Sequence, residues 1–593
     1  MKYIRNFSII AHIDHGKSTL ADRFIELSKK KKYKANQILD SMDLEKEKGI
    51  TIKSQCVTLP YTYNNENYIF NIIDTPGHAD FSYEVSRALS SCEGAILLID
   101  ASQGIEAQTL SNYNKAIKEN IKVIPVLNKI DLIQARPEDI KNDLNNILKI
   151  DSNEIIEISA KEGTGINNLI KNIIDKIPAP KNNDKNPFKA LIIDSWYNNF
   201  LGIISLIRVM DGTLSKDNII SIYSTNKSYK INKLGVFTPE KIYKNELKTG
   251  EIGFIEMDSK STNIFSIGDT ISLTSNPTKT PLPGFKKTTS KVFAGIFPED
   301  PKDFKHLTLA LSKLILNDSS LVYSGQKSNI FGFGFKCGFL GLLHMEIIQE
   351  RLKREYNLEI ITTFPNVIFK LIKHNNEVIY IDTPTMFNEN ERTTKILEPI
   401  AKINIITYKE YLGQVITLCI KNRGIQTNII YTSNQVSIDY EIPMVELLSD
   451  FFEQLQTVTS GFSSLDYYFY KFKEANLTKL NILINKKKVD ALEFILHKDK
   501  AYNKSKAIIE TIKKLIPKHM FEISIQAAIG KKIISKTTIK ALRKNVTEKC
   551  YGGDISRKKK LLKKQAKGKK RMKNIGTVQI PQETFLTIFR KGR

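Results

Sequence analysis

The chain has 593 residues, 41% of them hydrophobic and 26% charged, and this length predicts several domains, about four by their usual size. No apolar run reaches the ~18 to 20 residues of a membrane-spanning helix, which argues against an integral membrane protein. Lys and Arg outnumber Asp and Glu by 89 to 63, and the net charge of +26 favours a polyanionic partner such as RNA, DNA or anionic lipid, although a Lys- and Asn-rich composition accounts for part of the excess.

The first motif lies between an apolar strand predicted at 5–11 and a helix predicted at 19–28. A phosphate-binding P-loop lies between a strand and a helix, as this segment does, with Gly16 and Ser18 at the turn. Ala11 stands where the strict motif has glycine. The loop amides and the helix N-terminus favour a β-phosphate, Lys17 reaches the β- and γ-phosphates, and the Ser18 hydroxyl binds Mg²⁺. The predicted nucleotide contacts in this loop are Asp14, His15, Gly16, Lys17, Ser18 and Thr19.

A second buried strand, predicted at 68–73, runs into the sequence D-T-P-G-H, which begins at Asp74. A carboxylate at the carboxyl end of such a strand provides the second, usually water-mediated, anchor for Mg²⁺. Gly77 lacks a side chain, so its amide can approach a γ-phosphate closely. Asp74 is therefore a candidate metal ligand, and Gly77 is a candidate nucleotide contact.

Two further apolar strands, predicted at 95–100 and 123–127, alternate with helical segments, and this alternation predicts a doubly wound parallel sheet. The second strand opens into a loop made of Asn128, Lys129, Ile130 and Asp131. The Asp131 carboxylate can accept hydrogen bonds from guanine N1–H and from the exocyclic N2 amine, and adenine offers neither in that arrangement. This loop therefore predicts selection of GTP over ATP.

A last strand of this region, predicted at 155–158, leads to a loop whose backbone can contact guanine O6. This loop consists of Ser159, Ala160 and Lys161. All of these elements occur in the order that a GTP- and GDP-binding domain requires, each at the end of a strand. We therefore predict a P-loop GTPase domain over residues 1–180.

Together these motifs resemble the translational GTPases. The segment K-G-I-T at 48–51 is similar to the switch I motif of that family, usually R-G-I-T-I, with Lys48 in place of the more common Arg. The resemblance implies that Thr51 closes over the γ-phosphate and completes the Mg²⁺ shell. It also implies that His78 is the catalytic histidine that positions the attacking water, and the competing interpretation is a loop histidine bonded to the backbone.

The same resemblance places Ile13 and Ile50 at an apolar gate that holds this histidine back, and Asp14 at a monovalent-cation site. Lys17 and His78 are thus the two catalytic candidates. No arginine finger is visible in the sequence, so we expect slow intrinsic hydrolysis that needs an external trigger.

The remainder of the chain predicts smaller domains. Past a polar, proline-bearing linker at 177–187, short alternating strands predict a translation-factor β-barrel over 188–282. After a second proline-rich linker at 276–287, the ranges 290–370 and 397–475 each predict the strand–helix–strand–strand–helix–strand order of a ferredoxin-like domain. The second range resembles domain V of elongation factor G, but the roughly 25 residues before it are too few for the domain that elongation factor G inserts there.

The last range, 476–593, is predicted to be a basic C-terminal domain. Between 556 and 573, eleven of eighteen residues are Lys or Arg and none is acidic or aromatic, which favours contact with phosphate backbones over base stacking. Such runs are usually solvated or disordered, but flanking glycines at 552–553 and the apolar segment 578–589 predict an anchored run. Ribosomal RNA or tRNA is the expected partner, and an anionic membrane is the alternative.

This C-terminal range and the segments FGFGFKCGFLGLLHMEIIQERL, EPIAKINIITYKEYLGQVITLC and NRGIQ resemble the elongation factor 4 (LepA) family over nearly the whole chain. The predicted fold is thus a multidomain α/β chain with a P-loop GTPase domain, a β-barrel, two ferredoxin-like α+β domains and a basic C-terminal domain. The resemblance implies a monomeric, ribosome-dependent GTPase that acts on 70S-type ribosomes and promotes back-translocation or corrects stalled elongation under stress. Two alternatives stay open: an RNA-binding assembly factor with GTP as a structural ligand, and a peripheral membrane GTPase.

The compartment is predicted from the cysteines and from the start of the chain. Five scattered cysteines without a C-x-x-C pair argue against a disulfide framework or a zinc site and favour a reducing compartment. The first nineteen residues already resemble a strand and a loop, so no signal or transit peptide is expected. These features predict a cytoplasmic protein, with a peripheral place on the cytoplasmic face of the inner membrane as the alternative.

Overall fold

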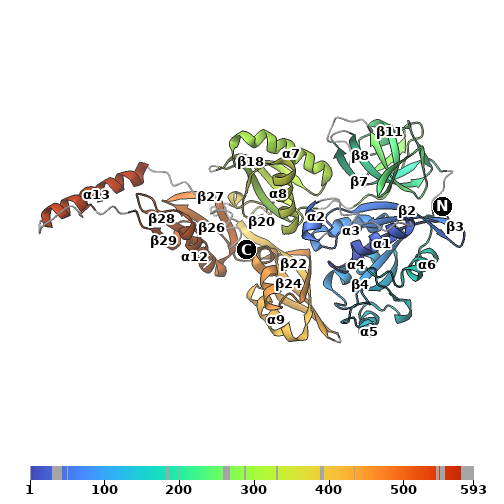
Figure 1. Cartoon of the computed structure of the whole chain (residues 1–593). Coiled ribbons are helices and arrows are strands. Elements are labelled where there is room, and N and C mark those ends of the chain that lie inside the picture. Colours follow the sequence, from blue (N-terminus) through green and yellow to red (C-terminus); the bar gives the residue numbers. More distant parts are fainter. Residues whose placement is uncertain are drawn as a thin grey trace.

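The computed structural model describes residues 2–29, 43–49, 51–181, 186–198, 201–257, 267–285, 289–328, 331–387, 393–432, 434–542, 546–547 and 555–575. Figure 1 shows the units that these residues form, from the N-terminal unit in blue to a basic helix in red. Across these ranges, no helix is both long enough and apolar enough to cross a membrane.

The N-terminal unit is a sheet of six strands with helices on both faces (Figure 1). Its elements are β1 (Ile4–Ala11), α1 (Lys17–Lys29), α2 (Asp43–Lys48), β2 (Gln55–Tyr63), β3 (Glu66–Asp74), α3 (Ser82–Ser90), β4 (Gly94–Asp100), α4 (Ala107–Lys118), β5 (Lys122–Asn128), α5 (Pro137–Leu148), β6 (Ile156–Glu157) and α6 (Ile166–Lys176). The strand order is β2-β3-β1-β4-β5-β6, and only the β2–β3 pair is antiparallel. β1 and β4 are buried along their whole length, as the central strands of a sheet covered on both faces must be.

The next unit is an antiparallel barrel. Its strands are β7 (Lys189–Asn198), β8 (Gly202–Asp211), β9 (Thr213–Ser215), β10 (Ile219–Ile222), β11 (Ser228–Thr238), β12 (Glu240–Lys244), β13 (Glu246–Lys248), β14 (Ile252–Met257) and β15 (Thr270–Leu273). The sheet runs β10-β15-β7-β8-β14-β11-β12, and β10 also pairs with β11. This second pairing closes the strands from β10 to β11 around an apolar core, and β12 is added on the outside of β11.

Two α/β units follow, each with the order strand–helix–strand–strand–helix–strand that the sequence predicts. The first contains β16 (Val292–Pro298), α7 (Phe304–Asn317), β17 (Val322–Ser328), β18 (Gly332–Phe339), α8 (Leu342–Tyr356) and β19 (Ile360–Thr362). The second contains β22 (Thr393–Tyr408), α9 (Leu412–Lys421), β23 (Ile425–Tyr431), β24 (Gln435–Pro443), α10 (Met444–Glu446), α11 (Phe452–Val458) and β25 (Ser463–Glu474). The strand orders β17-β18-β16-β19 and β23-β24-β22-β25 are equivalent, and both are ferredoxin-like.

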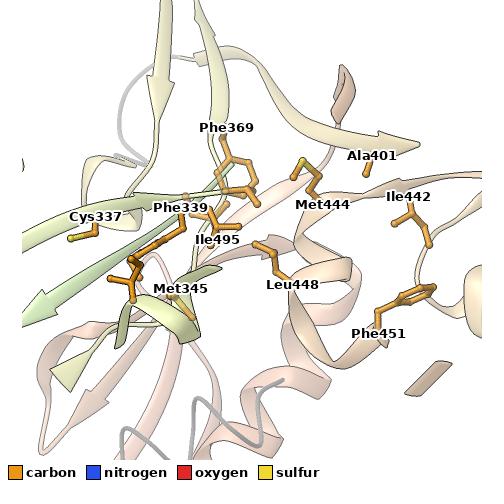
Figure 2. Close-up of a cluster of buried hydrophobic side chains, with 14 of the residues drawn as sticks. Cys337, Phe339, Met345, Phe369, Ala401, Ile442, Met444, Leu448, Phe451 and Ile495 are labelled. Carbon is orange, nitrogen blue, oxygen red and sulfur yellow. The ribbon is translucent and has the colours of Figure 1, made fainter. Parts of the chain in front are cut away.

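The segment between these two units forms a hairpin of β20 (Phe369–Lys373) and β21 (Val378–Ile381). β20 extends across the boundary predicted at 370, and it pairs with β22, so the hairpin enlarges the sheet of the second unit. Figure 2 shows one apolar cluster that contains Met345 of the first unit, Phe369 of the hairpin and Leu448 of the second unit. The two α/β units therefore share a core.

The C-terminal unit begins with the sheet β27-β26-β28-β29, against which α12 packs. Its elements are β26 (Leu477–Ile484), β27 (Lys487–His497), α12 (Lys498–Leu515), β28 (Ile523–Ile529), β29 (Lys532–Ile539) and α13 (Ile555–Ile575). The basic run predicted at 556–573 lies in α13, which extends away from the rest of the chain (Figure 1). The flanking segments 552–553 and 578–589, on which the predicted anchoring of this run depends, lie outside the described residues.

Candidate functional site

The carboxyl ends of the parallel strands bring the first three motifs together. Lys17 is the first residue of α1, and its Nζ donates hydrogen bonds to Asp74 Oδ1 at 2.9 Å and to Thr51 Oγ1 at 2.7 Å. Only 8% of Lys17 and 1% of Asp74 are exposed. One buried ammonium thus joins the P-loop, the switch I segment and the end of β3 at a single point.

The same cluster fits a phosphate-bound Mg²⁺ ion. Asp74 Oδ2 is buried and has no hydrogen-bond partner in the described part of the chain. No group of three or more His, Cys, Asp or Glu side chains within that part could hold a metal alone. One carboxylate and the hydroxyls of Ser18 and Thr51 match the way Mg²⁺ binds to proteins, with few protein ligands and substrate phosphates for the rest.

The loop at 128–131, which is predicted to select guanine, is tied to the P-loop by polar contacts. Asn128 Nδ2 donates to the His15 carbonyl at 2.9 Å, and Asn128 Oδ1 accepts from the Ala160 amide at 2.9 Å. Lys129 has a positive φ of 62°, and its Nζ donates to the Asp14 carbonyl at 2.6 Å and pairs with Asp100 at 2.8 Å. These contacts therefore fix the relative positions of three loops that are far apart in the sequence, around the place where the base is expected to bind.

The remaining loop residues occupy positions that suit contact with a nucleotide. Asp131 and Lys161 are exposed, and Ile130 and Ser18 are half-buried. Arg23 donates to the carbonyls of Ala160 and Lys161 and so holds the third loop in place. Sequence reasoning did not identify Arg23, because its partners lie well over a hundred residues away and no local pattern marks them.

His15 contributes to this site through its backbone, since its ring is fully buried beneath the loop. The His15 Nδ1 accepts a hydrogen bond from the Asp100 amide at 3.3 Å. Burial lowers the pKa of His15 to about 4, and burial together with the neighbouring His15 lowers the pKa of His12 to about 3. Both rings are therefore neutral near pH 7, and neither adds positive charge behind the phosphates.

His78 lies in the loop between β3 and α3, directly before a short 3₁₀ turn, Ala79–Phe81. Its Nδ1 accepts a hydrogen bond from the Asp80 amide at 3.1 Å, and a quarter of its side chain is exposed. A hydrogen bond to the backbone is what the alternative interpretation, a structural loop histidine, predicts for His78. This bond engages only Nδ1, so Nε2 is still available for a contact with water. Ile13 lies beside Gly77, with its Cγ1 at 3.4 Å from a Cβ placed there, whereas Ile50 lies outside the described residues.

Asp80 and Phe81 are the neighbours of His78 that sequence reasoning missed. Both are buried; Asp80 contacts α8 of the first α/β unit and β25 of the second, and Phe81 contacts α8. A buried Asp two residues after a candidate catalytic histidine is a weak signal in a sequence, because its partners are brought in only by the fold.

Three family models match the chain in consecutive order. The Elongation factor Tu GTP binding domain matches residues 2–179, the Elongation factor G C-terminus matches 395–483, and the GTP-binding protein LepA C-terminus matches 484–590. The first match identifies the N-terminal unit as a GTP-hydrolysing domain, in agreement with the geometry of its loops.

The fold is also similar to a crystal structure of a protein from Thermus thermophilus. The TM-score is 0.59 at 14% sequence identity, and the match covers 80% of this chain and 98% of that chain. At this identity the likeness concerns the fold alone. The order of the three matched domains shows that the chain belongs to the elongation factor 4 (LepA) family of translational GTPases.

Proposed function

We propose that this GTPase is triggered by 70S-type ribosomes and acts during elongation, where it promotes back-translocation or corrects stalled ribosomes under stress. The observation that carries the proposal is the contact of Lys17 with both Thr51 and Asp74. This contact between Lys17, Thr51 and the end of β3 supports a mechanism in which a γ-phosphate orders both proposed switch segments and its loss releases them.

The residues of the cluster have separate roles in this proposal. Lys17 moves from Asp74 to the β- and γ-phosphates, where it stabilises the charge that develops during phosphoryl transfer. Ser18, Thr51 and Asp74 would hold Mg²⁺, which neutralises phosphate charge when bound. The carboxylate of Asp131 selects guanine, and the amides of Gly16 and Thr19 cradle the phosphates.

His78 is proposed to orient the attacking water. Its Nδ1 is occupied by the Asp80 amide, so the proton of the neutral ring lies on Nε2, and this nitrogen is the one available to the water. The Asp14 carbonyl accepts a hydrogen bond from Lys129, and the exposed Asp14 carboxylate is the group proposed for the monovalent-cation site.

The basic helix α13 is the proposed contact with ribosomal RNA or tRNA. It carries the run of eleven Lys and Arg residues at 556–573 and extends from the end of the molecule (Figure 1). Without aromatic side chains in the run, binding depends on neutralised phosphates and weakens steeply as salt rises. The same charges would attract an anionic membrane, which is the alternative source of phosphate.

The test is GTP turnover with and without 70S ribosomes, for the wild type, for His78→Ala and for a matched control, His374→Ala. His374 is exposed in the β20–β21 turn, far along the chain from the nucleotide loops. We expect stimulation by several orders of magnitude in the wild type and the control, and its loss in His78→Ala. Turnover that ribosomes leave unchanged would contradict the proposal and favour the RNA-assembly factor, and binding to anionic vesicles that requires α13 would favour the membrane alternative.

A further inference from the structure

Asp80 links the loop that carries His78 to two other units. Only 5% of Asp80 is exposed, and its carboxylate accepts one hydrogen bond from each unit. Tyr467 of β25 donates its hydroxyl to Oδ1 at 2.7 Å, and the Leu343 amide of α8 donates to Oδ2 at 3.0 Å. Both carboxylate oxygens are thus engaged by elements that lie more than 260 residues further along the chain.

The contact with α8 is a helix cap supplied by another domain. Leu343 is the second residue of α8, and the residue that precedes the helix, Gly341, has no side chain to cap it. The first amides of a helix lack partners within the helix, and a carboxylate there satisfies one of them and interacts favourably with the helix dipole. Asp80 therefore stabilises α8 and is itself held in place by α8.

α8 contacts both switch segments. Its residue Ile347 packs in one apolar cluster with Leu44 and Ile52 of the switch I segment and with Phe81, which follows Asp80. Arg354, further along α8, donates two hydrogen bonds of 2.8 Å to Glu47 of α2. The side of α8 that faces the GTPase domain therefore contacts residues at both proposed switch segments.

The start of α8 is held by buried polar contacts of His344. His344 is fully buried, its Nδ1 accepts from the Leu340 amide at 3.0 Å, and its Nε2 lies 2.8 Å from Asp318 Oδ2. Burial alone raises the pKa of Asp318, but the interactions with His344 and the hydrogen bonds from Ser320 together outweigh it and leave that pKa lowered. The His344 ring also lies against Phe81, with 6.1 Å between ring centroids.

Tyr467 is likewise a fixed donor. Its strand β25 is attached to the GTPase domain at a second point, where the Ala107 amide of α4 donates to Ser464 Oγ at 2.9 Å. Burial and the nearby Asp80 charge raise the pKa of Tyr467 well above its ordinary value, so its hydroxyl stays protonated. Ser464 thus holds the strand to a part of the domain outside the switches, so a variant that lacks the Tyr467–Asp80 bond keeps this second contact between the two units.

We propose that Asp80 is a positioning residue for GTP hydrolysis, which fastens the His78 segment to α8 and β25 and so couples the switch to the two α/β units. The inference rests on the role proposed for His78. The Asp80 amide donates to His78 Nδ1, so the position of Asp80 sets the orientation of the imidazole. A displacement of α8 or β25 reaches the imidazole through two hydrogen bonds, and a nucleotide-driven displacement of the switch reaches α8 by the same route.

Two substitutions break the link from opposite sides without touching the nucleotide loops. Tyr467→Phe removes only the hydroxyl. Gly341→Ala places a Cβ 2.1 Å from Asp80 Oδ1, and since the φ of Gly341 is −164°, an extended value that any residue adopts, the conflict with Asp80 is its main effect. Gly325→Ala, in β17 of the same unit, is the matched control, because nothing lies within 4 Å of the added Cβ.

The first readout is hydrogen exchange of the α8 amides at 342–344 in the full chain, with GDP and with a non-hydrolysable GTP analogue. In the wild type, in Gly325→Ala and in Tyr467→Phe, which keeps the bond from the Leu343 amide to Asp80, we expect the exchange rate to depend on the nucleotide. In Gly341→Ala, which displaces Asp80 from α8, we expect this dependence to be smaller than in the control. The proposal is overturned if the wild-type amides exchange equally with both nucleotides. This outcome does not depend on ribosomes, so it is separate from a failure of the proposed function.

The second readout is ribosome-stimulated turnover. We expect kcat to fall about three- to tenfold in Tyr467→Phe, the equivalent of one hydrogen bond, with KM for GTP and the affinity for GDP unchanged. A purely structural contact would instead change stability and leave kcat as in the control. An unchanged kcat in both variants, with wild-type stimulation intact, would refute the positioning role.

Discussion

Lys17 has a structural task in the nucleotide-free protein that can be separated from its task in catalysis. It provides the ammonium next to Asp74, whose second oxygen has no partner among the described residues. Lys17→Met keeps a flexible apolar stem of similar length but leaves the Asp74 carboxylate, 1% exposed, without its countercharge. The nucleotide-free GTPase domain should therefore lose stability as well as activity.

The size of the loss follows from the burial of the pair. Removal of one partner from a buried ion pair costs about 3–5 kcal/mol, since the remaining charge is neither hydrated nor paired. Lys17→Met/Asp74→Asn removes both charges, so we expect it to recover at least about 2 kcal/mol of that loss while turnover stays abolished. Lys141→Met is the control: its partners Glu138 and Glu157 lie at the surface, with 82% and 37% of their side chains exposed, and the loss of each pair costs about 1 kcal/mol or less.

The assay is hydrogen exchange of β1 and β3 in nucleotide-free protein, because a chain of several domains does not unfold in one transition and its overall melting point has no single meaning. We expect protection of both strands to fall in Lys17→Met, to return in large part in the double variant, and to stay unchanged in Lys141→Met. Equal protection in Lys17→Met and in the wild type would refute the reasoning, and so would a double variant no more protected than the single one.

Three further predictions concern other parts of the chain. Gly16→Ala should weaken GDP binding at least about tenfold in an equilibrium titration. The reason is that the φ of Gly16 is +90° and that an added Cβ would lie 2.4 Å from Asn128 Nδ2. GDP binding as tight as in the wild type would contradict this prediction. Burial raises the pKa of Glu106 from 4.5 to about 7, so the folded state retains a proton that the unfolded chain releases. The wild type should therefore lose up to roughly 3 kcal/mol of stability as pH rises from 4.5 to 7, and Glu106→Gln should not. If the pH profiles of α4 hydrogen exchange are parallel in the two proteins, the shift is excluded. Replacement of Lys558, Lys559 and Lys560 by Gln should reduce the salt dependence of ribosome binding by a slope of about 2 to 3, and an unchanged slope in a titration with KCl would remove α13 from the interface.

The sequence by itself determined the nucleotide-binding motifs, the fold class and the family. The P-loop and the guanine loop are each a short stretch of chain at the end of an apolar strand, so their chemistry is encoded locally. The alternation of strands and helices predicted the parallel sheet, and the repeated strand–helix–strand–strand–helix–strand order predicted the two ferredoxin-like units, because hydrophobic periodicity directly reflects which face of an element is buried.

Only the tertiary structure decided how these pieces act on one another. It turned the ring of His15 inward, joined Lys17 to Thr51 and Asp74, and assigned the β20–β21 hairpin to the sheet of the second α/β unit. The contact between Asp80 and Tyr467 joins residues 387 positions apart. Neither residue has a distinctive local pattern, because a buried hydrogen bond between domains depends on where two folded surfaces meet, and that position is set by the packing of the whole chain.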